Sequence, residues 1–129
     1  MAPIQSFRDL LVWNAAMDLV LTTYAVAARL PASERFVLGT QLRRAALSIP
    51  SNVAEGHASG PGRRYLNHVR IAIGSWAELD TQFEVARRLH VLSPDDTAIV
   101  GEQLTRTGQL LHGLVRSLRK AETQTRGMR

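Results

Sequence analysis

The chain has 129 residues, no cysteine, a net charge of +5 and a sequence pI near 11. This length fits one domain with a sizeable core, and the lack of cysteine excludes disulfides and thiolate metal sites. The basic balance favours polyanionic partners, chiefly nucleic acid.

The N-terminal segment, residues 1–5, shows no basic stretch followed by an apolar core, so no signal peptide is expected. Uncharged apolar-rich runs such as residues 19–28 fall short of the roughly 20 residues that span a bilayer. We therefore expect a cytoplasmic protein without a membrane partner.

The first half of the chain predicts two helices. The first carries an apolar stripe at spacings of three and four and ends before Pro31; the stripe consists of Leu10, Trp13, Met17, Val20, Tyr24 and Ala27. Residues 31–39 are predicted to form a connection with one helical turn. The second helix continues through Pro50, because its apolar spacing does; its stripe consists of Leu38, Leu42, Ala45, Ile49 and Val53.

The second half predicts a loop and two more helices. Residues 56–62 hold three glycines and a proline, which favours a loop. The third helix has the stripe Tyr65, Val69, Ala72, Trp76, Leu79, Phe83 and Ala86. The fourth begins with Ser93 as its cap and Pro94 as its first residue, and has the stripe Val100, Leu104, Thr107, Leu111, Leu114 and Leu118.

Four amphipathic periods with short connections predict an all-α fold, an antiparallel up-down four-helix bundle. We expect a single domain over residues 7–122. The polar segment 123–129 is predicted to be a disordered tail.

Three segments carry a resemblance to a known family: QLRRAALSIPSNVAEG at 41–56, FRDLLVW at 7–13 and IAIGSWAEL at 71–79. The chain resembles the four-helix bundle family of 23S rRNA intervening-sequence proteins, or S23 ribosomal protein-like proteins. The resemblance implies a homopentameric ring. It also implies kinship with the accessory protein of diversity-generating retroelements, a basic pentamer that binds RNA and a reverse transcriptase. Trp76 departs from the family, which more often has a smaller apolar residue there, and the loop 57–62 is this chain's own.

Polar residues on the second and third helices have two interpretations. The set consists of Arg43, Arg44, Ser48, Asn52 and Glu55, with Glu78 facing them from the third helix. They could form a ligand or RNA site. We favour a structural network in which an arginine pairs with Glu78 or Glu55, since polar groups on facing helices need partners.

The arginines differ in their position along the helices. Arg87 and Arg88 close the third helix, and Arg116, Arg119 and Lys120 are predicted to close the fourth, where the helix dipole favours cations. Arg63 and Arg64 open the third helix, where a cation is unfavourable. Together with His57 and His68 they are the candidates for phosphate contact, although a solvated surface pair fits them equally well.

The sequence favours a binding protein over an enzyme. The four histidines lack metal-binding spacing, no Glu-x-x-His occurs, and the glycine loop is not a P-loop. No cofactor or metal is expected. The aromatic residues are spaced as core or interface anchors rather than as base-stacking platforms: Trp13, Tyr24, Tyr65, Trp76 and Phe83.

We therefore expect a homo-oligomeric bundle whose basic surface binds RNA or a nucleic-acid-processing protein. One alternative is a protein–protein scaffold on which the charge is incidental. Another is a bundle that binds a small ligand at a polar site near Arg44 and Glu78.

Overall fold

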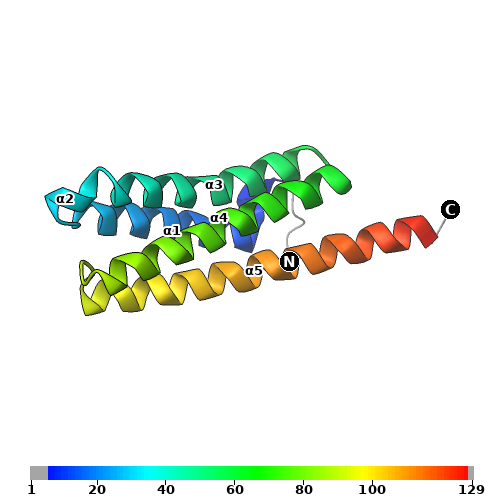
Figure 1. Cartoon of the computed structure of the whole chain (residues 1–129). Helices are drawn as coiled ribbons and strands as arrows, with labels where there is room; N and C mark the ends of the chain where they lie inside the picture. Colours follow the sequence, from blue (N-terminus) through cyan, green and yellow to red (C-terminus); the bar gives the residue numbers. More distant parts are fainter. Residues whose placement is uncertain (1–5, 128–129) are drawn as a thin grey trace.

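The computed structural model describes residues 6–127, which are almost entirely helical and contain no strand. Four long helices form the molecule: α1 (Leu11–Ala28), α3 (Leu38–Ala58), α4 (Arg63–Arg88) and α5 (Pro94–Gly127). The short helices are η1 (Phe7–Asp9) before α1 and α2 (Ala32–Arg35) at the corner between α1 and α3. Figure 1 shows the four long helices running alternately up and down, with α5 extending beyond the others at its C-terminal end. The predicted antiparallel four-helix bundle is confirmed.

The long helices form a closed square. The main contacts join α1 to α3, α3 to α4, α4 to α5 and α5 back to α1. The predicted stripe of α3 is buried throughout, and that of α4 is buried apart from the half-buried Trp76. On α5 the predicted residues are buried as far as Leu111; beyond it Val115 is buried, while Leu114 and Leu118 are only partly covered.

The stripe predicted for α1 is only partly the buried face: Val20 and Ala27 lie in the core, and Leu10 and Trp13 pack against it. The buried face is centred on Leu19 and includes Ala16, Thr23 and Val26, whereas Tyr24 is 42% exposed. The physical reason is that α1 is apolar on nearly all sides, so spacings of three and four can be traced along more than one face. Packing against both α3 and α5 then selects the broader face of small and branched side chains.

Helix α1 is 18 residues long with a mean hydropathy of 1.4, which is long and apolar enough for a membrane span. The expectation that every apolar run is too short to cross a bilayer is therefore wrong for this helix. Eight of its 18 residues are buried inside the bundle. Core helices of bundles pass the same test, so the match in length and composition is weak evidence for a membrane segment.

The α3–α4 connection is shorter than predicted. Helix α3 continues through Pro50 and Gly56 to Ala58, so only residues 59–62 form the turn. Gly60 and Gly62 have φ values of +86° and +130°, which L side chains rarely adopt. Gly56 instead serves close packing, because a Cβ there would lie 2.8 Å from Cβ of His68 and 2.9 Å from Cδ1 of Tyr65.

Helix α5 starts as predicted, with the Ser93 hydroxyl accepting a hydrogen bond from the Asp96 amide at 3.0 Å. It does not end where predicted. The segment expected to be a disordered tail from residue 123 is helical as far as Gly127. Residues 128–129 of that predicted tail, and residues 1–5, for which no signal peptide was expected, lie outside the described residues.

Candidate nucleic-acid interface

A polar seam, formed by Ser48 and Asn52 of α3 and His68 and Ser75 of α4, joins the two helices. It includes several of the residues that the sequence analysis names. The hydroxyls of Ser48 and Ser75 lie 2.7 Å apart in a hydrogen bond across the two helices. The Asn52 amide donates to the carbonyl and hydroxyl oxygens of Ser48, and its Oδ1 lies 3.1 Å from Nδ1 of His68. Half-buried polar groups on facing helices thereby satisfy one another, which fixes the register of α3 against α4.

The arginines predicted to join this seam do not. Glu55 lies 3.6 Å from His68, and Glu78 accepts a hydrogen bond from Gln82 on its own helix. Within residues 6–127, Arg43 and Arg44 make no hydrogen bond or ion pair. The predicted arginine–glutamate pairing is therefore wrong. Serine and asparagine side chains, which are short enough to bond across closely packed helices, hold the register instead.

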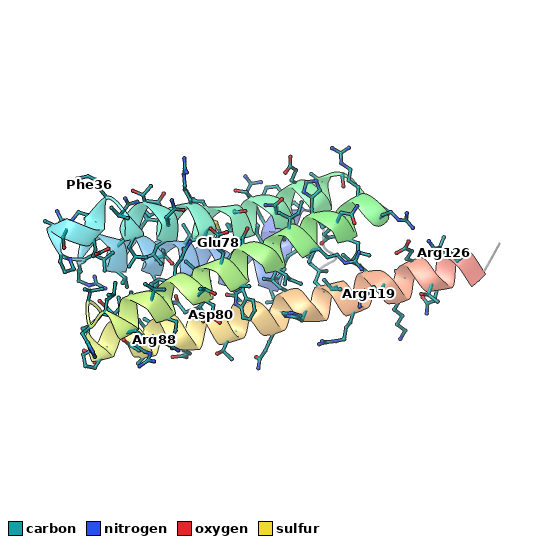
Figure 2. All side chains as sticks on the ribbon, in the orientation of Figure 1. Phe36, Glu78, Asp80, Arg88, Arg119 and Arg126 are labelled. Atoms are coloured by element: carbon teal, nitrogen blue, oxygen red, sulfur yellow. The ribbon has the colours of Figure 1, made fainter. Side chains whose placement is uncertain are left out.

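A basic hollow lies between the start of α4 and the C-terminal half of α5. It is open to solvent and has a volume of about 440 Å³. Its lining includes four arginines and one carboxylate: Arg63 and Arg70 from α4, and Arg119, Glu122 and Arg126 from α5. Figure 2 labels Arg119 and Arg126 on the exposed end of α5. The antiparallel arrangement places the first turns of one helix beside the last turns of the other.

One carboxylate only partly neutralises this hollow. Glu122 lies 3.4 Å from Arg126 and 3.7 Å from Arg63. Within the described part of the chain, Arg70 and Arg119 have no acidic partner. The local charge is therefore positive, and exposed guanidinium groups suit phosphate oxygens, which they bind in a planar, bidentate geometry.

The dipole interpretation of the arginines on α5 needs correction. Arg116, Arg119 and Lys120 were predicted to close the last helix, but α5 continues to Gly127 and only Arg126 lies in its last turn. The helix dipole acts over the last turn only, so it does not explain the other three cations. The dipole interpretation holds for Arg87 and Arg88, which do close α4.

The four predicted phosphate-contact residues fall in different places. Arg63 lines the basic hollow, and Arg64 beside it is exposed. His68 belongs to the polar seam, with only 18% of its side chain exposed. The ring of His57 packs edge-on against Tyr65 at 5.7 Å. Sequence reasoning missed Arg70, Arg119 and Arg126, although the i, i+7 spacing within each helix places each arginine pair on one face.

A second hollow continues the same α4–α5 groove. It has a volume of about 490 Å³, and its walls include Trp76 and Asp80 from α4 with Gln109, His112 and Arg116 from α5. The indole Nε1 of Trp76 donates to the Leu104 carbonyl at 2.7 Å, and the ring fits against Gly108, where a Cβ would lie 2.4 Å from Cζ2. The His112 ring stands edge-on to the indole at 5.7 Å.

Acidic and basic groups pair with one another at the opposite end of the bundle. Arg29 at the end of α1 makes a bidentate hydrogen bond to Asp96 at the start of α5, at 2.7 and 3.1 Å, and lowers the pKa of that carboxyl. On α4, hydrogen bonds from Arg87 and then Arg88 lower the pKa of Glu84 to about 2. These carboxylates neutralise Arg29, Arg87 and Arg88, whereas the basic hollow has one carboxylate for four arginines.

Among residues 6–127, no three histidine or acidic side chains are grouped so that they could hold a metal ion. The two hollows offer the guanidinium groups of the basic hollow and the aromatic and polar side chains of its neighbour. The arrangement suits binding of an anion or a base.

Comparison with known proteins gives a family and a fold. Residues 8–113 match the family model described as 23S rRNA-intervening sequence protein. Among solved structures, the chain is similar to a protein of unknown function from the S23 ribosomal protein family of Bacteroides thetaiotaomicron VPI-5482. The TM-score is 0.75 at 18% identity, over 81% of this chain and 95% of the other, and this likeness shows the fold alone. No curated protein matches the chain.

Proposed function

Because the chain belongs to the family of 23S rRNA-intervening sequence proteins, we propose that it is a non-enzymatic, homo-oligomeric binding module that holds RNA on the basic α4–α5 groove. The observation that carries the proposal is the excess of arginines over carboxylates in the basic hollow, where Glu122 is shared by Arg63 and Arg126 and two further arginines have no acidic partner among the described residues. From residue 103 to the end of α5 there are five basic side chains and one acidic one, Glu122. Such a surface attracts the phosphate backbone without reading sequence.

Self-association is the second part of the proposal. Several large apolar side chains are each at least 66% exposed: Leu11, Leu21, Phe36 and Val37. Exposed apolar groups of this size favour contact with another protein surface. The family resemblance implies a pentameric ring, and five chains of net charge +5 would carry +25. A ring would repeat the groove around one axis, so an RNA could contact several copies at once.

Binding to RNA across a salt series tests the proposal, with the oligomer mass recorded by light scattering in the same buffers. Affinity should fall linearly on logarithmic axes as salt rises, because each phosphate contact releases condensed counterions. Replacing Arg70 and Arg119 by glutamine should lower that slope by roughly 1.4 for a single strand, or about 0.7 for each lost contact.

A matched control removes the same charge elsewhere. Arg35 and Arg44 are exposed on α2 and α3 and do not line the hollow, so their double glutamine variant should keep the wild-type slope. Equal slopes in both double variants, or binding that ignores salt, would contradict the proposal.

A protein partner is the other candidate, because the exposed Phe36 and Val37 at the α2 corner offer an apolar contact. Under that alternative a partner would co-purify after nuclease treatment, and RNA affinity at low salt would be undetectable. A small-ligand site near Arg44 and Glu78 has less support, since Ser48 and Ser75 bond each other between α3 and α4. Mass spectrometry of the purified protein would reveal a bound ligand.

A further inference from the structure

The two hollows of the α4–α5 groove offer different chemistry to a ligand that lies along it. In the basic hollow, arginines outnumber the one carboxylate by four to one. The neighbouring hollow holds two aromatic rings, a guanidinium, a side-chain amide and the carboxylate of Asp80. Arg116 lines one and Arg119 the other, three residues apart on α5, so the hollows adjoin.

The aromatic hollow suits a nucleobase better than a phosphate. Asp80 makes no hydrogen bond or ion pair within residues 6–127. No cation neutralises its carboxylate there, so the negative charge disfavours a phosphate in this hollow. The same carboxylate would accept a hydrogen bond from an exocyclic amino group. Figure 2 labels Asp80 between α4 and α5. Arg116 and Gln109 offer donors from the facing helix, which complement the carbonyl and ring-nitrogen acceptors of a base.

The aromatic groups are held in place before any ligand arrives. The bond from the Trp76 indole to Leu104 and the close fit against Gly108 fix that ring. Nδ1 of His112 lies 2.7 Å from the Gly108 carbonyl oxygen, which orients the imidazole while the residue stays exposed. A fixed aromatic wall beside a basic track is the arrangement by which proteins bind unpaired strands, since bases stack on rings while phosphates follow the cations.

We propose that the α4–α5 groove binds single-stranded RNA, with one base in the hollow beside Trp76 and His112 and the adjoining phosphates on the arginines of the basic hollow. This inference rests on the proposed function, which it narrows to one class of RNA. A duplex keeps its bases stacked and paired, so none of them can enter the aromatic hollow, and its contacts with the groove are those of the backbone and the 2′-hydroxyls. Asp80 further favours bases that carry an exocyclic amino group, which are cytosine, adenine and guanine, over uracil, which has none.

The test uses the full chain with Trp13 replaced by phenylalanine, which leaves Trp76 as the only tryptophan. Trp13 lies in the first turn of α1, where its ring centroid is 5.3 Å from that of Phe7 in η1, and it does not line the groove. The probes are labelled oligocytidine, labelled oligouridine and an RNA duplex of equal length. Anisotropy reports binding, and emission from Trp76 reports contact in the aromatic hollow.

We expect oligocytidine to bind most tightly and to change the emission of Trp76. The duplex should bind at low salt and leave the emission of Trp76 unchanged. Loss of stacking in His112→Ala should weaken single-strand binding roughly fivefold or more and leave duplex binding as it was. Asp80→Asn should reduce the preference for oligocytidine over oligouridine. Gln41→Ala, at an exposed site on α3, is the matched control and should change nothing.

Duplex binding as tight as single-strand binding, with constant Trp76 emission, would overturn this inference and leave the proposed function standing. Absence of binding by all three RNAs at low salt would overturn the proposed function and the inference with it. Wild-type affinities in His112→Ala, with its helix content intact by circular dichroism, would also overturn the inference.

Discussion

Replacing Gly108 by alanine should destabilise the bundle, because the Trp76 indole occupies the space that a side chain would need. An ideal Cβ at residue 108 would lie 2.4 Å from Cζ2 and 2.6 Å from Cε2 of that ring, where ordinary contacts are 3.4–4 Å. The ring must therefore move by about 1 Å, which breaks its 2.7 Å hydrogen bond to Leu104. Overpacking costs about 1–3 kcal/mol and the lost bond about 1 kcal/mol.

Alanine also has a better helix propensity than glycine, by about 1 kcal/mol, which offsets the lost bond. The net loss is then about 1–3 kcal/mol, or a fall in Tm of roughly 3–15 °C for a chain of this size. Thermal unfolding followed by circular dichroism measures it. Gly101→Ala is the matched control on the same helix, because a Cβ there meets nothing within 4 Å, and it should be neutral or stabilising.

Two results would refute the reasoning. One is a Gly108→Ala variant as stable as Gly101→Ala. The other is an equal cost of Gly108→Ala in a Trp76→Ala background, where the clash is absent, since residues in contact should show coupling in a double-mutant cycle.

Three further predictions concern other parts of the molecule. Gly56→Ala should lower Tm, because its Cβ would lie 2.9 Å from the Tyr65 ring and push α3 away from α4; an unchanged Tm would contradict the packing. Glu122→Gln should raise RNA affinity about 1.4- to 5-fold, because the carboxylate that pairs with Arg63 no longer competes with phosphate; unchanged affinity by anisotropy would place RNA elsewhere. Asp96→Asn should remove the part of the folding stability that the Arg29–Asp96 pair supplies. Because the folded pKa of this carboxyl lies below 3.8, the pair stabilises the fold above about pH 4, and that stabilisation disappears as the pH falls further. Denaturant unfolding at several pH values should show wild type and variant converging in acid, and a constant gap would contradict this assignment.

The fold could be predicted where the sequence pattern allowed one solution. Helices α3, α4 and α5 each carry a single apolar stripe against polar neighbours, and these stripes are the buried faces apart from Trp76 on α4 and the C-terminal part of α5. Helix α1 lacks that contrast, so its rotation depended on the two helices that flank it. Gly56 was assigned to a loop because glycine usually marks one, but the close approach of Tyr65 in another helix explains it.

The end of α5 shows a different limit. No apolar stripe continues past Leu118, so the sequence favoured a tail, whereas the helix itself needs no buried face. Glu122 and Arg126 are one turn apart and pair at 3.4 Å, which supports the helix in solvent.

The candidate site was only partly visible in the sequence. Arg63 stood out because a cation is unfavourable at the start of a helix. Arg119 and Arg126 lie more than 50 residues away and join it only through the antiparallel packing of α4 on α5. Their significance was further hidden by the predicted helix end, which gave the basic residues of α5 a local explanation.

The contact between α1 and α5 has a consequence for synthesis of the chain. Arg29 and Asp96, which tie these helices together, are 67 residues apart. At about 5–20 residues per second, a ribosome needs roughly 3–13 s to travel that distance. Once α3 has been synthesised, α1, the most apolar helix, can pack against it, but the face of α1 that α5 covers stays open until α5 follows. The nascent chain thus exposes an apolar face of α1, which a chaperone or a neighbouring nascent chain can bind before α5 emerges.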